Sequence, residues 1–196
     1  MSRPELLSLP KMTVDQFMDW DGGGHVGKLE LIDGVVRAMA PASATHSIIQ
    51  GNLVAAIHTH LRATGRRCRV APEAAMQPAI RKLGNVRVPD LAVTCASPSQ
   101  AKLFVDPVLI IEVLSPSNED DTWESIRALA PLLTLTEIVM VASEKIEVEI
   151  FRREPAGAWT TEPGVVHSGR IELTSIGLDL DIAEVYRGTY LDAAES

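Results

Sequence analysis

The sequence predicts a single α/β (α+β) domain with a mixed central sheet flanked by helices, and two observations support this. Short runs rich in Val, Ile and Leu occur at residues 90–95 and 108–114 and are typical of strands covered on both faces. A helical segment follows the second run and leads into another apolar run, an order that implies a right-handed parallel crossover. The length of 196 residues fits one hydrophobic core. We expect that domain over residues 12–190, with tails at 1–11 and 191–196.

The domain is expected to begin with a short helix and a hairpin. Thr13 has the spacing of a capping box with the glutamine three residues later, which favours a helix over residues 13–20. Strands are predicted at 29–32 and 35–39. Between them, Asp33–Gly34 suits the positive φ angles of a tight turn, so the chain is expected to reverse there.

A longer helix is expected after Pro41. Ser43 or Thr45 can cap its N-terminus, and Gly65 is a natural stop. Its apolar residues recur every four positions and share one face: Ile49, Leu53, Ile57 and Leu61. Further strands are expected at 69–71, 74–80, 86–88, 137–142, 146–151, 159–161 and 170–173, and a further helix at 122–133.

The composition limits the function classes. The two cysteines, Cys68 and Cys95, are too few to predict a disulfide framework, and no Cys-x-x-Cys pair indicates a zinc site. We therefore expect a reduced, cytoplasmic compartment. Residues 1–10 lack the pattern of a signal peptide, and no stretch approaches the ~20 apolar residues of a membrane span. No membrane partner is expected.

The formal net charge of −8 argues against broad, non-specific attraction to nucleic acid. The charge is nevertheless uneven, because the segment 58–87 holds seven basic residues and one acid. Such a segment is compatible with a phosphate-contacting surface, and equally with a solvated helix end and a charged loop. Its basic residues are Arg62, Arg66, Arg67, Arg69, Arg81, Lys82 and Arg87.

Three carboxylates stand among apolar residues. Asp90 opens one predicted strand, Glu112 lies inside the run at 108–114, and Glu30 lies in the hairpin. An ionised carboxylate in an apolar strand is destabilising unless a partner balances it, and Mg²⁺ is a hard ion that prefers oxygen ligands. One solution is therefore a Mg²⁺ or Mn²⁺ ion held by Asp90 and Glu112, and Glu30 can close the same cluster. The alternative is that each acid is held by hydrogen bonds or by an arginine such as Arg87.

Several segments occur in a consistent order along the chain: 12–17, Glu30-Leu31-Ile32-Asp33-Gly34, 43–46, Val88-Pro89-Asp90-Leu91, 109–117, 122–124, 173–178 and 184–186. Together, over about 12–186, they resemble the Uma-type family of restriction-endonuclease-like proteins in the PD-(D/E)XK nuclease superfamily. The resemblance implies a restriction-endonuclease-like fold, a Mg²⁺ ion at Glu30, Asp90 and Glu112, and hydrolysis of DNA phosphodiester bonds.

The chain departs from the family pattern at the catalytic lysine. Leu114 stands two residues after Glu112, and Ser125 stands at the alternative position on the next helix. Lys145 is the candidate substitute, with a solvated turn lysine as the alternative, and Arg127 remains charged and is a poor base. General-base assistance is typically worth ~10²–10⁴-fold, so we expect weak or absent activity.

The candidate substrate-binding residues are His46, Arg62, Arg66 and Arg67. His46 lies at a helix start, where it can contact phosphate or orient a carboxylate, or can simply be a polar first-turn residue. The function predicted first is a Mg²⁺-dependent DNA endonuclease. The alternatives are a non-catalytic nucleic-acid-binding or partner-binding protein on a degraded nuclease scaffold, and a protein whose acids only pair with arginines. A homodimer through the apolar stretch 131–135 would suit an enzyme that cuts two strands.

Overall fold

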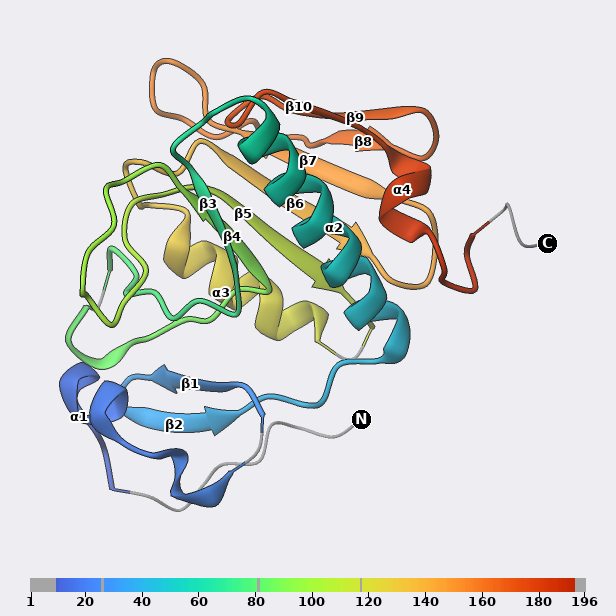
Figure 1. Cartoon of the computed structure of the whole chain (residues 1–196). Coiled ribbons are helices and arrows are strands. Elements are labelled where there is room, and N and C mark those ends of the chain that lie inside the picture. Colours follow the sequence, from blue (N-terminus) through green and yellow to red (C-terminus); the bar gives the residue numbers. More distant parts are fainter. Residues whose placement is uncertain (1–9, 26, 81, 117, 193–196) are drawn as a thin grey trace.

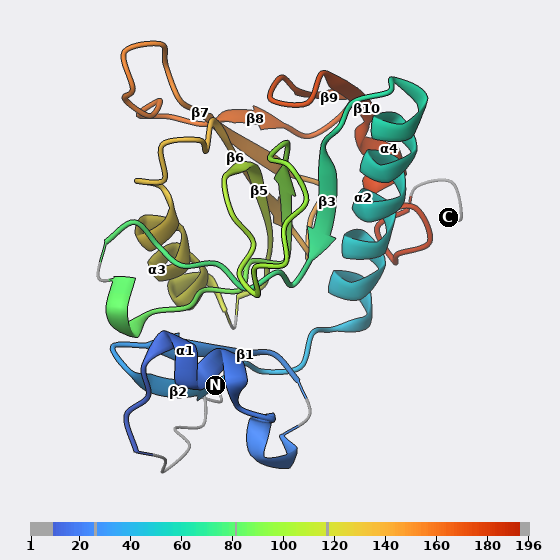
Figure 2. The same cartoon turned by 60° about the vertical axis from the view of Figure 1, so that its left-hand side comes forward.

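The molecule has three layers, with a mixed sheet in the middle (Figures 1 and 2). Helix α3 (Glu119–Leu129) covers one face of the sheet, and helix α2 (Ala44–Ala63) covers the other beside helix α4 (Ile182–Tyr186). The predicted sheet flanked by helices is confirmed. The computed structural model describes residues 10–25, 27–80, 82–116 and 118–192.

The central sheet has six strands in the order β3-β4-β5-β6-β7-β8. The β5–β6 pair is parallel and the other neighbouring pairs are antiparallel, so the predicted crossover through α3 is confirmed. The strands are β3 (Arg69–Pro72), β4 (Leu91–Thr94), β5 (Pro107–Leu114), β6 (Glu137–Ala142), β7 (Val148–Arg152) and β8 (Gly164–Val166).

A small unit of one helix and one hairpin lies below the sheet in Figures 1 and 2. Helix α1 (Val14–Asp19) begins with the predicted capping box, in which both hydrogen bonds form. The hairpin joins β1 (Leu29–Ile32) to β2 (Val35–Ala38) through the predicted turn, where Asp33 and Gly34 have φ angles of 49° and 82°. The unit is attached to the rest by a β-bridge between Leu31 and Val86.

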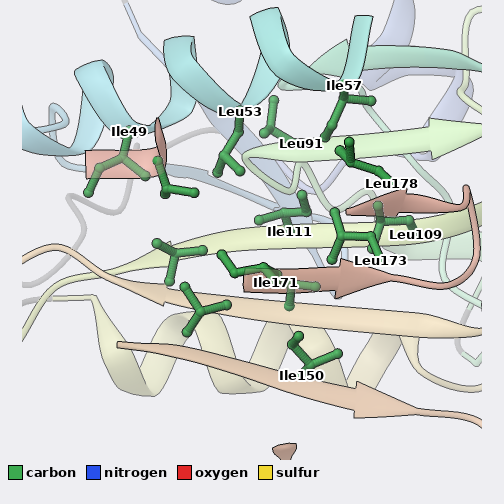
Figure 3. Packing of buried hydrophobic residues seen from close by; sticks show 14 of the residues in the cluster. Ile49, Leu53, Ile57, Leu91, Leu109, Ile111, Ile150, Ile171, Leu173 and Leu178 are labelled. Atoms are coloured by element: carbon green, nitrogen blue, oxygen red, sulfur yellow. The ribbon is translucent and has the colours of Figure 1, made fainter. Parts of the chain in front are cut away.

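The main core lies between α2 and the sheet (Figure 3). Ser43 caps α2, and the four apolar residues that the sequence places on one face are all buried there. Alternate residues of β5, namely Leu109, Ile111 and Val113, face this core, whereas Ile110 packs in a second core under α3. The hairpin of β9 (Arg170–Leu173) and β10 (Leu178–Asp181) closes the main core.

Several element predictions were wrong. Residues 74–80 and 86–88 form bridges, Met76 with Arg87 and Leu31 with Val86, and no ladder strand. Pro78 is one reason, because proline lacks the N–H group that a ladder needs. Residues 159–161 contribute only the bridge between Arg153 and Trp159. Helix α3 begins three residues earlier than predicted. Its first turn holds Glu119, Asp120 and Asp121, and acidic side chains stabilise a helix N-terminus. Strands β8 and β10 and helix α4 were not predicted, since each is too short to show a period.

The cysteine prediction was also wrong. Cys68 and Cys95 form a disulfide with a Cα–Cα distance of 3.9 Å. The register explains the pairing, because Arg69 lies opposite Thr94 and the cysteines are the next pair outward. Their separation of 27 residues conceals this neighbourhood in the sequence. No helix in the described ranges is long and apolar enough to cross a membrane.

Candidate active site

The register of the central strands brings Asp90 and Glu112 together. Leu91 lies opposite Ile111, so the next pair outward sets Asp90 beside Glu112. Two backbone N–H groups bind these carboxylates: the Asp90 N–H donates to Glu112 Oε2 at 3.1 Å, and the N–H of Val113, the residue after Glu112, donates to Asp90 Oδ2 at 2.9 Å. Both acids are buried, with exposed fractions of 5% and 4%.

Glu30 joins this region from the hairpin, but an arginine balances its charge. Glu30 Oε2 lies 3.1 Å from Arg87 Nη1, and Glu30 Oε1 accepts the Val88 N–H at 2.8 Å. Arg87 is itself buried, and its Nη2 donates to Glu124 Oε1 on α3 at 2.9 Å. Since both oxygens of Glu30 have protein partners, Glu30 orients Arg87 and the chain leading to Asp90. For Glu30, the alternative of pairing with Arg87 is confirmed.

Two further side chains converge on Asp90. Lys28 Nζ lies 3.1 Å from Asp90 Oδ1, and His46 Nε2 lies 3.2 Å from Asp90 Oδ2. One turn further along α2, Gln50 donates its amide to the Asp90 carbonyl oxygen at 2.9 Å. His46 and Lys28 thus contact the same carboxylate, and His46 lies within the acidic site.

Lys28 is the residue that the sequence analysis missed. It precedes β1, and its carbonyl oxygen accepts the Met39 N–H, which extends the hairpin ladder by one pair. Side chains two apart on a strand share a face, so Lys28 lies on the same face as Glu30. Arg37, opposite Glu30 in the register, completes this polar face and lies 3.9 Å from Glu124. The predicted strand at 29–32 stopped one residue short of Lys28, and extending it by that residue would have placed Lys28 on the face of Glu30.

The electrostatics distinguish the two central acids. Burial alone would raise the pKa of Asp90, but the His46 hydrogen bond, the Lys28 charge and the Val113 N–H outweigh it and lower that pKa. For Glu112, burial and the nearby Asp90 charge raise the pKa well above its ordinary value. Burial lowers the pKa of Lys28, yet the charges of Glu112, Asp90 and Glu30 reverse this and raise it. Lys28 thus keeps its positive charge, and Glu112 is the acid whose negative charge has the fewest partners.

Two buried side-chain atoms within the described ranges lack a hydrogen-bond partner, Arg87 Nε and Ser125 Oγ. Arg87 belongs to the site through Glu30. Ser125 lies on α3 and stands where the family resemblance would align a lysine. Buried polar groups are nearly always paired, so the Arg87 guanidinium is incompletely satisfied within the site.

Other predicted residues lie elsewhere. Lys145 is 65% exposed and pairs with Glu147, and that hydrogen bond, followed by the charges of Glu147, Glu149 and Glu119, raises its pKa. None of these partners belongs to the acidic site, so the structure gives Lys145 no part in it.

The basic segment does not form one surface. Arg62 lies 16 residues along α2 from His46, which corresponds to ~24 Å at 1.5 Å per residue. Arg66 and Arg67 follow it beyond the C-terminus of α2, and all three are exposed. Arg87 is buried in the acidic site instead. Arg81 lies outside the described residues.

The comparisons with known proteins agree with this fold. Residues 14–183 match the profile of a family described as "Uma2: Putative restriction endonuclease". The chain belongs to this family. A relative from Synechocystis sp., "Uncharacterized protein slr1290", is 30% identical over 182 residues, covering 91% of this chain and 93% of the relative. The crystal structure of "a putative nuclease belonging to DUF820" from Anabaena variabilis superposes with a TM-score of 0.69 at 18% identity, covering 89% of this chain and 97% of that one.

The donor set can be tested against a divalent ion. Asp90 and Glu112 supply adjacent carboxylate oxygens, which suit a hard cation such as Mg²⁺, and Glu112 has no ion pair among the described residues. Glu30 does not fit as a direct ligand, because Arg87 and Val88 occupy both its oxygens. Across the described ranges, no three His, Cys, Asp or Glu side chains are placed to hold one ion. The residues thus fit an ion held by two carboxylates, and the predicted triad of protein ligands is reduced to a pair.

Proposed function

We propose that this protein is a Mg²⁺- or Mn²⁺-dependent endonuclease that hydrolyses DNA phosphodiester bonds, with Asp90 and Glu112 as its active-site carboxylates. The observation that carries the proposal is the state of Glu112. It is a buried carboxylate beside a second carboxylate, it receives one backbone hydrogen bond, and its pKa is raised. A protein that needed Glu112 only for stability would do better with a neutral side chain there. A bound divalent cation would balance the negative charge of Glu112.

Each residue of the site has a role in this proposal. When bound, Mg²⁺ supplies charge stabilisation for the phosphoryl group and activates water. Asp90 and Glu112 hold the ion, and His46 fixes the orientation of the Asp90 carboxylate. Glu30 holds Arg87, which in turn fixes α3 through Glu124. The burial of these groups limits competing water and strengthens each electrostatic contact.

The decisive experiment is cleavage of supercoiled plasmid in Mg²⁺ or Mn²⁺, with metal binding measured by calorimetry. Wild-type protein should nick the plasmid, and Glu112→Gln should reduce the rate by more than the ~10–100-fold that removal of an outer-shell partner costs. Glu172→Gln is a matched control, because Glu172 is an exposed glutamate on β9. If the wild-type protein neither binds metal nor nicks DNA, the endonuclease proposal is wrong.

A second candidate is a non-catalytic nucleic-acid-binding or partner-binding protein on a nuclease scaffold. It is favoured by the pairing of Asp90, whose two oxygens already accept from Lys28, His46 and Val113. It predicts DNA binding that survives Asp90→Ala, whereas a metal-dependent nuclease loses metal affinity and cleavage with that change.

The arginines at the end of α2 provide a test of DNA binding under either candidate. Arg62, Arg66 and Arg67 form no ion pair with a described residue, so they are available to phosphates. Replacing all three with alanine should lower the slope of log K against log salt by ~0.9 for each phosphate that the variant no longer neutralises. Arg170→Ala is the control, since Arg170 is exposed but paired with Asp179. An unchanged slope in the triple variant excludes this surface. Size measurements with and without DNA would test the expected homodimer.

A further inference from the structure

Lys28 occupies the position in the site from which a cation can act on a substrate. Its ammonium lies against Asp90, and its side chain is 17% exposed, against 7% for Asp90 and 4% for Arg87. Lys28 is therefore the cation nearest to solvent among the groups that contact the acids. Arg87 cannot take this part, because Glu30 and Glu124 hold its guanidinium on both sides.

Two other lysines pair with acids away from the site. Lys102 is exposed and pairs with Asp19, and Lys145 is exposed and pairs with Glu147. The positions at which the resemblance would place a catalytic lysine hold Leu114 and Ser125. The acidic site nevertheless contains a lysine, Lys28, which immediately precedes β1 of the hairpin.

A phosphate diester is repelled by the carboxylates of Asp90 and Glu112 unless a positive charge compensates them. Lys28 and a divalent cation satisfy the same acids, so they compete for Asp90. An ammonium on a four-carbon stem can move several ångströms without backbone rearrangement, whereas a guanidinium held at both ends cannot. Lys28 can thus leave Asp90 when another cation binds, and its partly exposed end can then turn toward the incoming phosphate.

We propose that Lys28 is a catalytic residue that replaces the missing lysine of the family pattern. It neutralises Asp90 in the free protein, yields that carboxylate to the divalent ion, and donates to the phosphate of the bound DNA. This inference rests on the proposed endonuclease function. Lys28 acts as a fixed positive charge, and no proton is removed from it at any step.

The proposal predicts opposite effects on two measurements. Lys28→Met removes a positive charge that competes with the metal, so the Mg²⁺ affinity measured by calorimetry should rise by ~10-fold or more. The rate of plasmid nicking at saturating Mg²⁺ should fall by ~10²-fold, mainly in kcat, because a charge that stabilises the transition state is removed. A lysine with a purely structural role would lower both, in proportion to the fraction unfolded.

Three further variants make the test decisive. Lys28→Gln keeps a hydrogen-bond donor for Asp90 and removes the charge. It should show the same rise in Mg²⁺ affinity and the same fall in nicking rate, and it replaces Lys28→Met if that variant folds poorly. Lys28→Arg keeps the charge and should keep the Mg²⁺ affinity close to that of the wild type. Lys102→Met, at an exposed lysine, should change neither measurement.

The outcomes separate the two proposals. If wild-type protein neither binds Mg²⁺ nor nicks DNA, the endonuclease function fails and the role of Lys28 fails with it. If wild-type protein nicks DNA and the folded neutral variants nick it equally fast, the endonuclease function stands and the role of Lys28 is wrong. A lower Mg²⁺ affinity in the folded neutral variants also contradicts the competition between Lys28 and the ion.

Discussion

Two buried glutamates on neighbouring parallel strands have opposite surroundings. Glu137, at the start of β6, is fully buried and accepts hydrogen bonds from Arg152, Thr174 and Ser175 at 2.7–3.1 Å. Glu112, near the end of β5, receives one hydrogen bond, from the Asp90 N–H. The parallel register places them toward opposite ends of the sheet. A buried carboxylate with a full set of donors organises the fold, whereas one with an incomplete set is available to a ligand.

The largest expected effect on stability concerns Glu137. Glu137→Gln removes the charge that five donor groups share, and the loss of a charge-assisted hydrogen bond at this fully buried carboxylate should cost ~1.5–3 kcal/mol, since the side chain of Arg152 is itself 38% exposed. Urea unfolding should show this loss, while Mg²⁺ affinity per folded molecule should stay unchanged. Glu172→Gln, on an exposed position of β9, should stay within ~0.5 kcal/mol of wild type. A change below ~1 kcal/mol in Glu137→Gln would remove the contrast between the two glutamates.

The second prediction concerns Glu112 and has the opposite sign. In the folded protein the pKa of Glu112 is raised above the ordinary 4.5, because burial favours the protonated carboxyl. The protonated form costs no stability below pH 4.5, and stability is lost as pH rises above 4.5 and the buried side chain ionises. In metal-free buffer at pH 8, Glu112→Gln should therefore stabilise the protein by ~1–3 kcal/mol, the cost of an incompletely paired buried group.

The difference between Glu112→Gln and wild type should shrink as the pH falls toward 4.5. Adding Mg²⁺ should raise the melting temperature of wild type more than that of the variant, because an ion bound only by the folded state stabilises it. Chemical unfolding at several pH values and thermal melting with Mg²⁺ provide the measurements. A large loss of stability in Glu112→Gln at pH 8 would place Glu112 in the same class as Glu137.

The smallest effect concerns Tyr186 on α4, a third buried polar group. Its Oη bridges Ala142 and Glu147, and burial raises its pKa to about 12. Tyr186→Phe should cost ~0.5–1.5 kcal/mol at neutral pH. The contribution of Tyr186 is complete below pH 10 and is lost as pH rises through 12, so alkaline unfolding should be shallower in the variant. Equal stability curves for both proteins between pH 9 and 12 would contradict this role.

The sequence by itself determined the elements whose signals are local. The period of Ile49, Leu53, Ile57 and Leu61 predicts α2 and its buried face, and Asp33–Gly34 predicts the hairpin turn, because both depend on residues close together in the chain. The sequence also singled out Asp90 and Glu112, since charge in an apolar strand is visible without a structure.

Only the tertiary structure decided which partners these acids have. Lys28 meets Asp90 across 62 residues, and Arg87 meets Glu30 across 57, so no local pattern reveals either pair. The same holds for the disulfide between Cys68 and Cys95, which depends on the β3–β4 register. Side-chain pairing across strands follows from register and hairpin placement. These depend on the packing of the whole core, which decides whether a buried acid is balanced by an arginine, by a lysine or by neither.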